Sequence, residues 1–326
     1  MVLAIFRLNL VMNNLVLFCC LLSTISFSQS LDTGIQQYEK QHYHEAKSIF
    51  GQVSKDHPGF DQAQYYLGRV AFGEGNVDQA TKYFRKAIGN NQNNAIYHFW
   101  LGNALGTVAR ESSIIKKGML APKIKKAFAK AVELDPKLID AHWGLLTFFT
   151  EAPGFLGGSE EKAEQTAQKI KQLDRIEGHR ALATVYVEQK KYDKAELEYV
   201  KLLELDSEHS MSLVFFYQNQ KKYDKAFELL NKMYDDDNDN AGVLYQIGRT
   251  SAFSGQQSDL GIRSLTAYLD KVEQEGLPSH AAARMRMAMI YEKINEQELA
   301  IQFYQRALSS EPDMKLASEG LARLKR

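Results

Sequence analysis

Cysteine is nearly missing from this sequence of 326 residues, since only Cys19 and Cys20 occur, side by side near the N-terminus. A chain without that segment would hold no disulfide and no thiol chemistry. Net charge is missing too, because 40 basic residues balance 40 acidic ones. Non-specific binding to nucleic acid or to anionic lipid depends on accumulated positive charge, so the composition predicts neither.

Long hydrophobic runs are absent except for "LVLFCCLLSTISF", from Leu15 to Phe27. This run is too short to span a bilayer but has the length of a secretory signal. Ser26 and Ser28 place small residues three positions and one position before a cut ahead of Gln29. We therefore expect residues 1–28 to be a cleaved signal peptide, which predicts a periplasmic or secreted mature protein with no stable membrane span.

Three alternatives for this segment stay open. Its basic region is weak, because Arg7 is the only charged residue before Asp32, and translation from Met12 would leave a leader without a basic residue. The run is also compatible with a retained N-terminal anchor helix. Lipid attachment at a cysteine fits poorly, since the bacterial motif has a small residue just before the cysteine.

The rest of the chain repeats with a period of thirty-four residues. "HYHEAKSIFGQVSKDHP" aligns with "NVDQATKYFRKAIGNNQ", so that Ala46 matches Ala80 and Phe50 matches Phe84. "YLGRVAF" and "WLGNALG" lie the same distance apart. Apolar residues in each copy are spaced as on one face of a helix, and small residues allow two helices to cross closely.

These residues resemble the tetratricopeptide repeat (TPR) family, whose motif has a Leu-Gly pair on a first helix and small and aromatic residues on a second. Leu67, Gly68, Ala80, Phe84 and Ala87 meet this motif in full. Eight copies cover about residues 30–313. The resemblance implies an all-α fold, a right-handed α-solenoid over residues 29–326 with a capping helix at 314–326.

The period breaks in two adjacent copies. About ten extra residues lie within "TVARESSIIKKGMLAPKI", and five more lie around "PGFLGGS". Both breaks fall between the two helices of a pair. We therefore expect two long loops, 107–123 and 151–159, that emerge near each other at one edge of the solenoid.

No stretch meets the requirements of a cofactor or metal site. "PGFLGGSEE" lacks the Lys-Ser/Thr pair of a phosphate-binding loop, and its glutamates would repel phosphate from the helix that Ser159 is expected to cap. "DDDNDN" has Asn240 and Gln246 where a calcium loop has Gly and Glu. His98, His142 and His179 recur at one repeat position. None has a second ligand at metal-binding spacing, which favours a role in helix packing over metal binding. We predict no cofactor, no metal and no enzyme activity.

The resemblance places a partner-binding groove on the first helices of the repeats. Two rows of positions, four residues apart, line that groove in the family. Here the rows are Tyr65, Phe99, Trp143, Arg180 and Tyr245, and Arg69, Asn103, Thr147, Thr184 and Arg249. Aromatic rings beside arginines and amides are typical of binding hot spots, although rings at this spacing also fill gaps between helices.

The sequence thus predicts a non-enzymatic scaffold that binds a peptide or partner protein in its concave groove. The alternative is a small-molecule or lipid carrier that uses the space beneath the paired loops 107–123 and 151–159.

Overall fold

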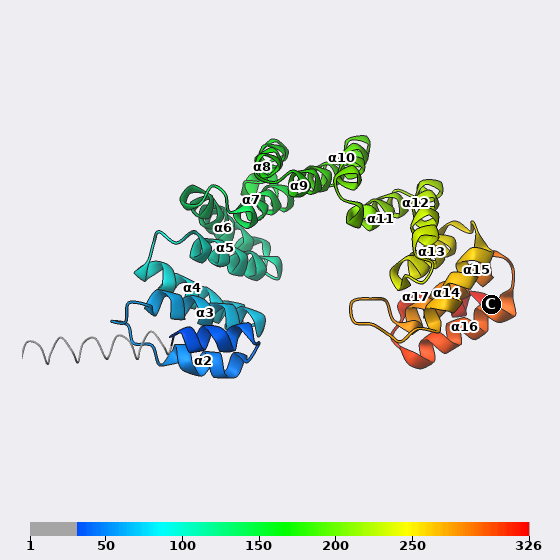
Figure 1. Ribbon diagram of the computed structural model, residues 1–326, viewed down its shortest axis with the longest axis horizontal. Helices are drawn as coiled ribbons and strands as arrows, with labels where there is room; N and C mark the ends of the chain where they lie inside the picture. The colour runs from blue at the N-terminus through cyan, green and yellow to red at the C-terminus, as the bar shows by residue number, and fades with distance from the viewer. Residues whose placement is uncertain (1–30, 326) are drawn as a thin grey trace, which may run out of the picture. The chain divides into compact units, whose positions relative to one another are not determined.

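The computed structural model describes residues 31–325 and contains no β-strand within them (Figure 1). The predicted signal peptide and both cysteines lie outside these residues. The chain forms two compact units that meet after Ala195, inside helix α10. No helix within the described part is long and apolar enough to cross a membrane.

Unit 1 is an array of antiparallel helix pairs, coloured blue to green in Figure 1. Its elements are a helix at 31–39, α2 (Tyr43–Gly51), α3 (Phe60–Gly73), α4 (Val77–Asn90), α5 (Ala95–Arg110), α6 (Ile114–Leu134), α7 (Ile139–Glu151), the short 3-10 helix η1 (Gly154–Leu156), α8 (Glu160–Leu173), α9 (Arg175–Glu188) and the start of α10 (Tyr192–Leu205).

Unit 2 continues the same pattern of helix pairs. After the rest of α10 it holds η2 (Ser207–His209), α11 (Ser210–Asn219), α12 (Tyr223–Asp236), α13 (Ala241–Ser254), α14 (Ser258–Leu269), α15 (His280–Lys293), α16 (Gln297–Ser310) and α17 (Lys315–Leu324). The sequence prediction of an all-α solenoid of repeated helix pairs is therefore confirmed.

A glycine on the first helix of a pair and a ring on the second explain why the pairs close. Gly68 lies against the ring of Phe84, and a Cβ at Gly68 would come within 2.5 Å of it. Gly102 and Phe128 repeat this contact, with 2.6 Å to a Cβ at Gly102. Only a residue without a Cβ lets the second helix approach so closely, and the buried ring then fills the space between the helices.

Asparagine and serine side chains fix where several helices begin. Asn76 Oδ1 accepts a hydrogen bond from the amide of Gln79, Asn94 Oδ1 from that of Ile96, and Ser159 Oγ from that of Lys162. Such caps satisfy amides that have no partner inside the helix. Ser159 caps α8 as the sequence predicts, and Ala163 in the first turn of α8 is fully buried.

The prediction of a long loop at 107–123 is wrong. The extra residues instead lengthen two helices, so that only Glu111–Ser113 separates α5 from the 21-residue helix α6. Leu120, Ala121 and Ile124 are spaced along one face of α6 and are buried. Burial of this apolar face stabilises the helix although it contains Pro122, which lies on the exposed side.

The second expected loop, 151–159, is present and tightly folded around η1. Gly157 has a φ of +103°, and a Cβ at Gly158 would come within 1.7 Å of the carbonyl oxygen of Ala152. The amides of Leu156, Gly157 and Gly158 donate to carbonyl oxygens of this segment, and the amide of Ser159 donates to that of Phe149 in α7. The glycines therefore serve the turn, and these amides are already bonded, which leaves the loop poorly suited to bind a phosphate.

Candidate functional site

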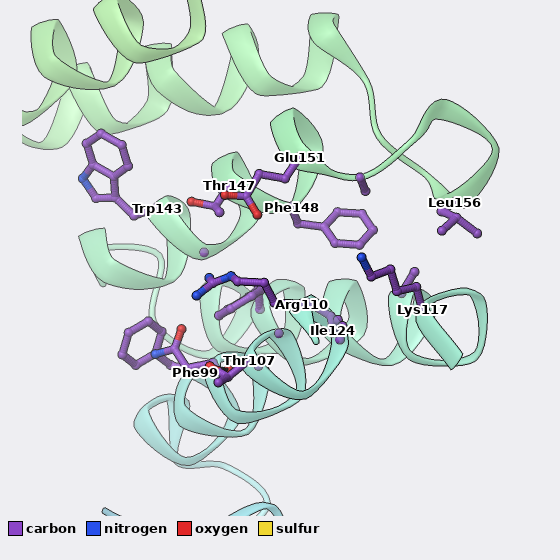
Figure 2. Close-up of a pocket in the computed structure, with 18 of the residues that line it drawn as sticks. Phe99, Thr107, Arg110, Lys117, Ile124, Trp143, Thr147, Phe148, Glu151 and Leu156 are labelled. Carbon is purple, nitrogen blue, oxygen red and sulfur yellow. Dashed lines mark hydrogen bonds between the residues drawn. The ribbon is translucent and has the colours of Figure 1, made fainter. Parts of the chain in front are cut away.

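A pocket of about 660 Å³ lies in unit 1 between α5, α6, α7 and the η1 loop (Figure 2). Helices α5 and α7 are the first helices of two adjacent pairs, and α6 connects them. Aromatic rings supply much of the lining, namely Phe72, Phe99, Trp100, Phe128, Trp143 and Phe148. A concave, mainly apolar pocket with few polar groups is the usual form of a ligand or side-chain binding site.

The floor of this pocket depends on two glycines. The Phe128 ring, from α6, lies between Gly102 of α5 and Gly144 of α7, and a Cβ at Gly144 would come within 2.4 Å of it. Because Phe128 is 5% exposed and held from both sides, α5 and α7 keep a fixed spacing. The pocket therefore has a rigid floor formed by the core.

Polar and charged side chains at the pocket come from opposite walls. Asn103 on α5 is half-buried and Thr147 on α7 is exposed. Arg110 and Lys117 belong to α5 and α6, whereas Asp140 and Glu151 belong to α7. None of these four charged groups forms an ion pair with another of the described residues. Their charges are therefore available to a bound molecule.

Four of the ten predicted groove residues line this pocket. Phe99 and Asn103 lie on α5, and Trp143 and Thr147 lie on α7 (Figure 2). The Phe99 ring contacts Phe128, with 6.2 Å between the ring centroids. The structure thus brings residues that are 44 apart in the sequence onto facing walls of one pocket.

Two further groove residues, Tyr65 and Arg69, lie on α3 and contact each other. Nη1 of Arg69 donates to the Tyr65 hydroxyl at 2.7 Å, and the guanidinium stands 3.8 Å from the Trp100 ring centroid. The Tyr65 ring stacks on Tyr97 at 5.3 Å. These contacts stiffen the first helices next to the pocket and already occupy Arg69.

Arg180 and Thr184 lie one repeat further along, on α9. Trp143 Nε1 donates to Glu177 Oε2 at 2.8 Å, and Arg180 pairs with the same oxygen at 2.5 Å. The Arg180 guanidinium also lies 5.0 Å from the Trp143 ring centroid. Arg180 therefore helps to orient Trp143 and does not line the pocket itself, and Thr184 Oγ1 donates to the Arg180 carbonyl oxygen.

The last two predicted groove residues, Tyr245 and Arg249, belong to unit 2. One of them, Tyr245, is buried and does not line a groove. Tyr245 is 4% exposed and packs in the core against Tyr268 and Leu265, so its ring does not line a surface. Arg249 is half-buried and donates to Gln218 Oε1 at 2.7 Å. Burial lowers the pKa of the Arg249 guanidinium, and the nearby Arg286 lowers it further.

Several pocket residues were absent from the predicted groove rows. They include Arg110, Lys117, Phe148 and Leu156, which lie in or beside the two segments where the period breaks. The carrier alternative placed a site beneath these segments, 107–123 and 151–159, but the expectation of a loop at 107–123 concealed its helical spacing. Leu120, Ile124 and Phe128, four positions apart, would have indicated a helix there.

The other candidate sites have structural explanations. Nε2 of His98 and of His142 each hydrogen-bonds a backbone oxygen six residues earlier, at 2.9 Å, which holds the preceding turn. Asn240 caps α13 and Lys271 pairs with Asp239 at 2.5 Å, which places the acidic segment in a turn between helix pairs. No group of three metal-ligating side chains occurs among residues 31–325.

Comparisons with known proteins agree with this architecture. Family models described as tetratricopeptide repeat match residues 31–95 and 69–105, and residues 181–209 and 281–314. A tetratricopeptide repeat protein from Parabacteroides merdae has a similar structure, with a TM-score of 0.55 and 13% identity over 92% of this chain and 99% of that one.

A second solved structure, a thermophilic TPR protein from Thermus thermophilus, has a TM-score of 0.47 and 20% identity over 59% of this chain and 99% of its own. None of the curated proteins compared matches the chain. Proteins of this fold generally serve as protein–protein interaction scaffolds. Repeat matches in both units, the paired helices and the glycine-to-ring contacts between them show that this chain is built of tetratricopeptide repeats.

Proposed function

We propose that this protein is a non-enzymatic scaffold that holds a segment of a partner protein in the unit 1 pocket. The observation that supports this most is the meeting of Phe99, Asn103, Trp143 and Thr147 around one pocket of about 660 Å³. Apolar side chains of the partner would enter between the aromatic rings of the pocket. Burial of these rings against the partner would supply much of the binding free energy.

The polar groups of the pocket suit an extended peptide. The half-buried Asn103 amide offers both a donor and an acceptor to a peptide backbone. Arg110 and Lys117 on one wall, and Asp140 and Glu151 on the other, would pair with charged residues that flank the apolar ones. Pairs at such a rim favour the correct partner and register more than they add affinity.

The repeat architecture supports a role without catalysis, because proteins of this fold generally act as scaffolds. No histidine, cysteine or serine is among the lining residues of the pocket within the described chain.

A substitution that fills the pocket tests this proposal. Thr147 is exposed on the pocket wall, so Thr147→Arg should block the pocket without disturbing the core. Thr184→Arg is the matched control, because Thr184 holds the corresponding place one repeat on and does not line the pocket. We expect Thr147→Arg to reduce capture of the partner from a cell extract at least about tenfold, since one hot-spot contact contributes about 2 kcal/mol or more.

The double variant Phe99→Ala and Trp143→Ala should have the same effect by removing the rings. Far-ultraviolet circular dichroism must stay helical, so that lost capture reports the pocket. Unchanged capture by both Thr147→Arg and the double variant would refute the pocket as the partner site.

A second candidate function is transport of a small molecule or lipid, because the pocket is apolar and large enough for one. Native mass spectrometry of the purified protein distinguishes the two. A carrier would retain a ligand of defined mass that Thr147→Arg loses, whereas the scaffold would show the mass of the polypeptide alone.

The extracytoplasmic location is also a proposal, supported by the apolar run at Leu15–Phe27 and the small residues at Ser26 and Ser28. Cell fractionation with N-terminal sequencing tests it. A mature protein that begins near Gln29 outside the cytoplasm is expected. A cytoplasmic protein that keeps its first 28 residues would contradict the proposal.

A further inference from the structure

Four large apolar side chains project into solvent at one corner of unit 1. Ile114, Ile115 and Met119, in the first two turns of α6, are 57%, 75% and 58% exposed, and Phe155 in η1 is 78% exposed. The two segments are neighbours, since a Cβ at Gly118 would lie 3.6 Å from Leu156. Figure 2 shows Lys117 and Leu156 side by side at this corner, which we call the α6–η1 tip.

The helix that forms this tip carries an excess of positive charge. Helix α6 holds six lysines and one acidic residue, Glu133 in its last turn, although the chain as a whole is neutral. Lys125 lies 5.8 Å from the Phe149 ring centroid, and Lys130 pairs with Glu133 at 2.6 Å. Lys116, Lys123 and Lys126 are exposed and form no ion pair with another described residue. The balanced composition therefore conceals a local excess of positive charge.

Apolar and basic side chains share one exposed face of α6. Ile115, Met119, Lys123 and Lys126 follow one another at intervals of four, four and three residues, which places them along one side of a helix. The opposite side is buried, with Leu120 at 9% and Ile124 at 7% exposure. Glu111, just before the helix, is the only acidic residue from 111 to 132. The exposed face of α6 therefore carries apolar residues near its N-terminus and lysines further along.

We propose that the α6–η1 tip docks this protein onto the surface of an anionic lipid bilayer. Ile114, Ile115, Met119 and Phe155 would enter the interface between headgroups and acyl chains, and the lysines would contact the anionic headgroups. Apolar side chains beside lysines are the composition of helices that bind in the membrane interface. Complementary charge favours this occupant, because α6 holds six lysines against one acidic residue, Glu133, and such a helix is attracted to an anionic surface.

The shape of the tip also favours lipid over a protein partner. Side chains that are more than half exposed project from the surface, so a protein partner would need a matching set of hollows. A bilayer interface accepts projecting apolar side chains without such a match. Of the four apolar tip residues, Ile114 also lines the pocket, whereas Ile115, Met119 and Phe155 do not. The tip can therefore be tested separately from the scaffold function through Ile115 and Phe155.

Co-sedimentation of the full chain with lipid vesicles tests the proposal. The vesicles contain either phosphatidylcholine with phosphatidylserine or phosphatidylcholine alone. We expect binding to the anionic vesicles that weakens as salt increases, and at least about tenfold weaker binding to the neutral ones. Equal binding to both vesicle types, or no binding to anionic vesicles at low salt, would overturn the proposal.

Variants assign the binding to the tip. Ile115→Glu with Phe155→Glu should reduce binding to anionic vesicles at least about tenfold, as should Lys116→Gln with Lys123→Gln and Lys126→Gln. Val272→Glu with Leu197→Glu is the matched control, since Val272 and Leu197 are 86% and 60% exposed and belong to unit 2. The N-terminal apolar run is common to all variants, so any difference belongs to the tip.

Two results would overturn the assignment of membrane binding to the α6–η1 tip. If both tip variants bind vesicles as the control does, the tip is not the membrane site. If light scattering shows a dimer of the wild type that Ile115→Glu with Phe155→Glu dissociates, the occupant is a second copy of this chain, which also overturns the proposal. Circular dichroism confirms that each variant remains helical.

Discussion

At the scale of single residues, the fold rests on glycines that make room for rings. The Phe128 ring lies between Gly102 and Gly144, and Phe84 covers Gly68 in the same manner. Glycine is required at these positions, because a methyl group would occupy space that the ring already fills. The Leu-Gly pair of the repeat thus has a direct physical reason.

This packing predicts the outcome of two matched glycine substitutions. Gly144→Ala should destabilise unit 1 by about 1–3 kcal/mol, since overpacking exceeds the gain of about 1 kcal/mol from the better helix former. Gly106→Ala, on α5, has open space around its added Cβ and should be neutral or stabilising. Urea unfolding followed by the fluorescence of Trp100 and Trp143 measures both. A stabilised Gly144→Ala would contradict the account of the pocket floor.

Residue positions inside the repeat were predictable because the period assigns them. Ala46, Ala80, Phe84 and Ala87, aligned by the period of thirty-four, are all fully buried. Assigning the two groove rows to the later repeats by alignment was less dependable. Tyr245 occupies an aligned position, yet it is buried in the core of unit 2. Spacing identifies the side of a helix, but burial also depends on what the neighbouring pair places against it.

At the scale of elements, α6 departs most from the repeat. It is 21 residues long, and its added N-terminal turns supply both a pocket wall and the α6–η1 tip. The break in the period predicted a loop here, and Gly118 and Pro122 locally disfavour a helix. Buried Leu120, Ala121 and Ile124 outweigh that local preference.

Pro122 should therefore reduce the stability of its own helix. A proline inside a helix removes the hydrogen bond to the carbonyl four residues earlier, here that of Gly118, and its ring crowds that carbonyl. Because Pro122 is exposed, its side chain contributes little packing. Pro122→Ala is expected to raise the free energy of unfolding of unit 1 by about 1–3 kcal/mol. Thermal unfolding of the two proteins measures this, and a lower midpoint for Pro122→Ala would contradict it.

Glu196 ties three elements of unit 2 together. Its carboxylate on α10 accepts hydrogen bonds from Lys222 at 2.6 Å, Lys225 at 2.5 Å and the Tyr217 hydroxyl at 3.1 Å. Burial alone would raise the pKa of Glu196, but these hydrogen bonds outweigh it and lower that pKa to about 2. The folded state therefore strongly prefers the ionised carboxylate.

The stability of unit 2 should depend on pH through this group. The ordinary pKa is 4.5, so between pH 4.5 and about 2 the unfolded chain binds a proton that the folded chain does not. The contribution of Glu196 is present above pH 4.5 and is lost as the pH falls toward 2. It is about 1–3 kcal/mol, with solvent screening of the lysines included.

Hydrogen exchange of the α11 and α12 amides can measure this contribution in wild type and Glu196→Gln. The difference in opening free energy should be constant above pH 5 and should shrink below pH 4.5. A difference that does not change with pH would show that the carboxylate is not the group responsible.

At the scale of the whole molecule, the arrangement into helix pairs was readable from the sequence, and the location of the pocket was predicted in part. Four of the ten predicted groove residues line it, and the carrier alternative placed a site beneath segments 107–123 and 151–159, which also contribute to the lining. Periodicity reports local helices and their stacking, which determine each unit. Whether the extra residues become a loop or longer helices depends on which side chains they bury. The distribution of charge was hidden, because a neutral total contains a helix with six lysines and one acidic residue, Glu133.

The central claim is that the unit 1 pocket receives a segment of a partner protein, and site-specific photocrosslinking in living cells tests it most directly. A photoreactive phenylalanine analogue at the exposed Glu151 lies on the pocket lining, and one at the exposed Leu197 does not. The account predicts a discrete crosslinked protein at position 151 that is absent at position 197 and is lost when Phe99→Ala is added. The same products at both positions, or none at position 151, would contradict it.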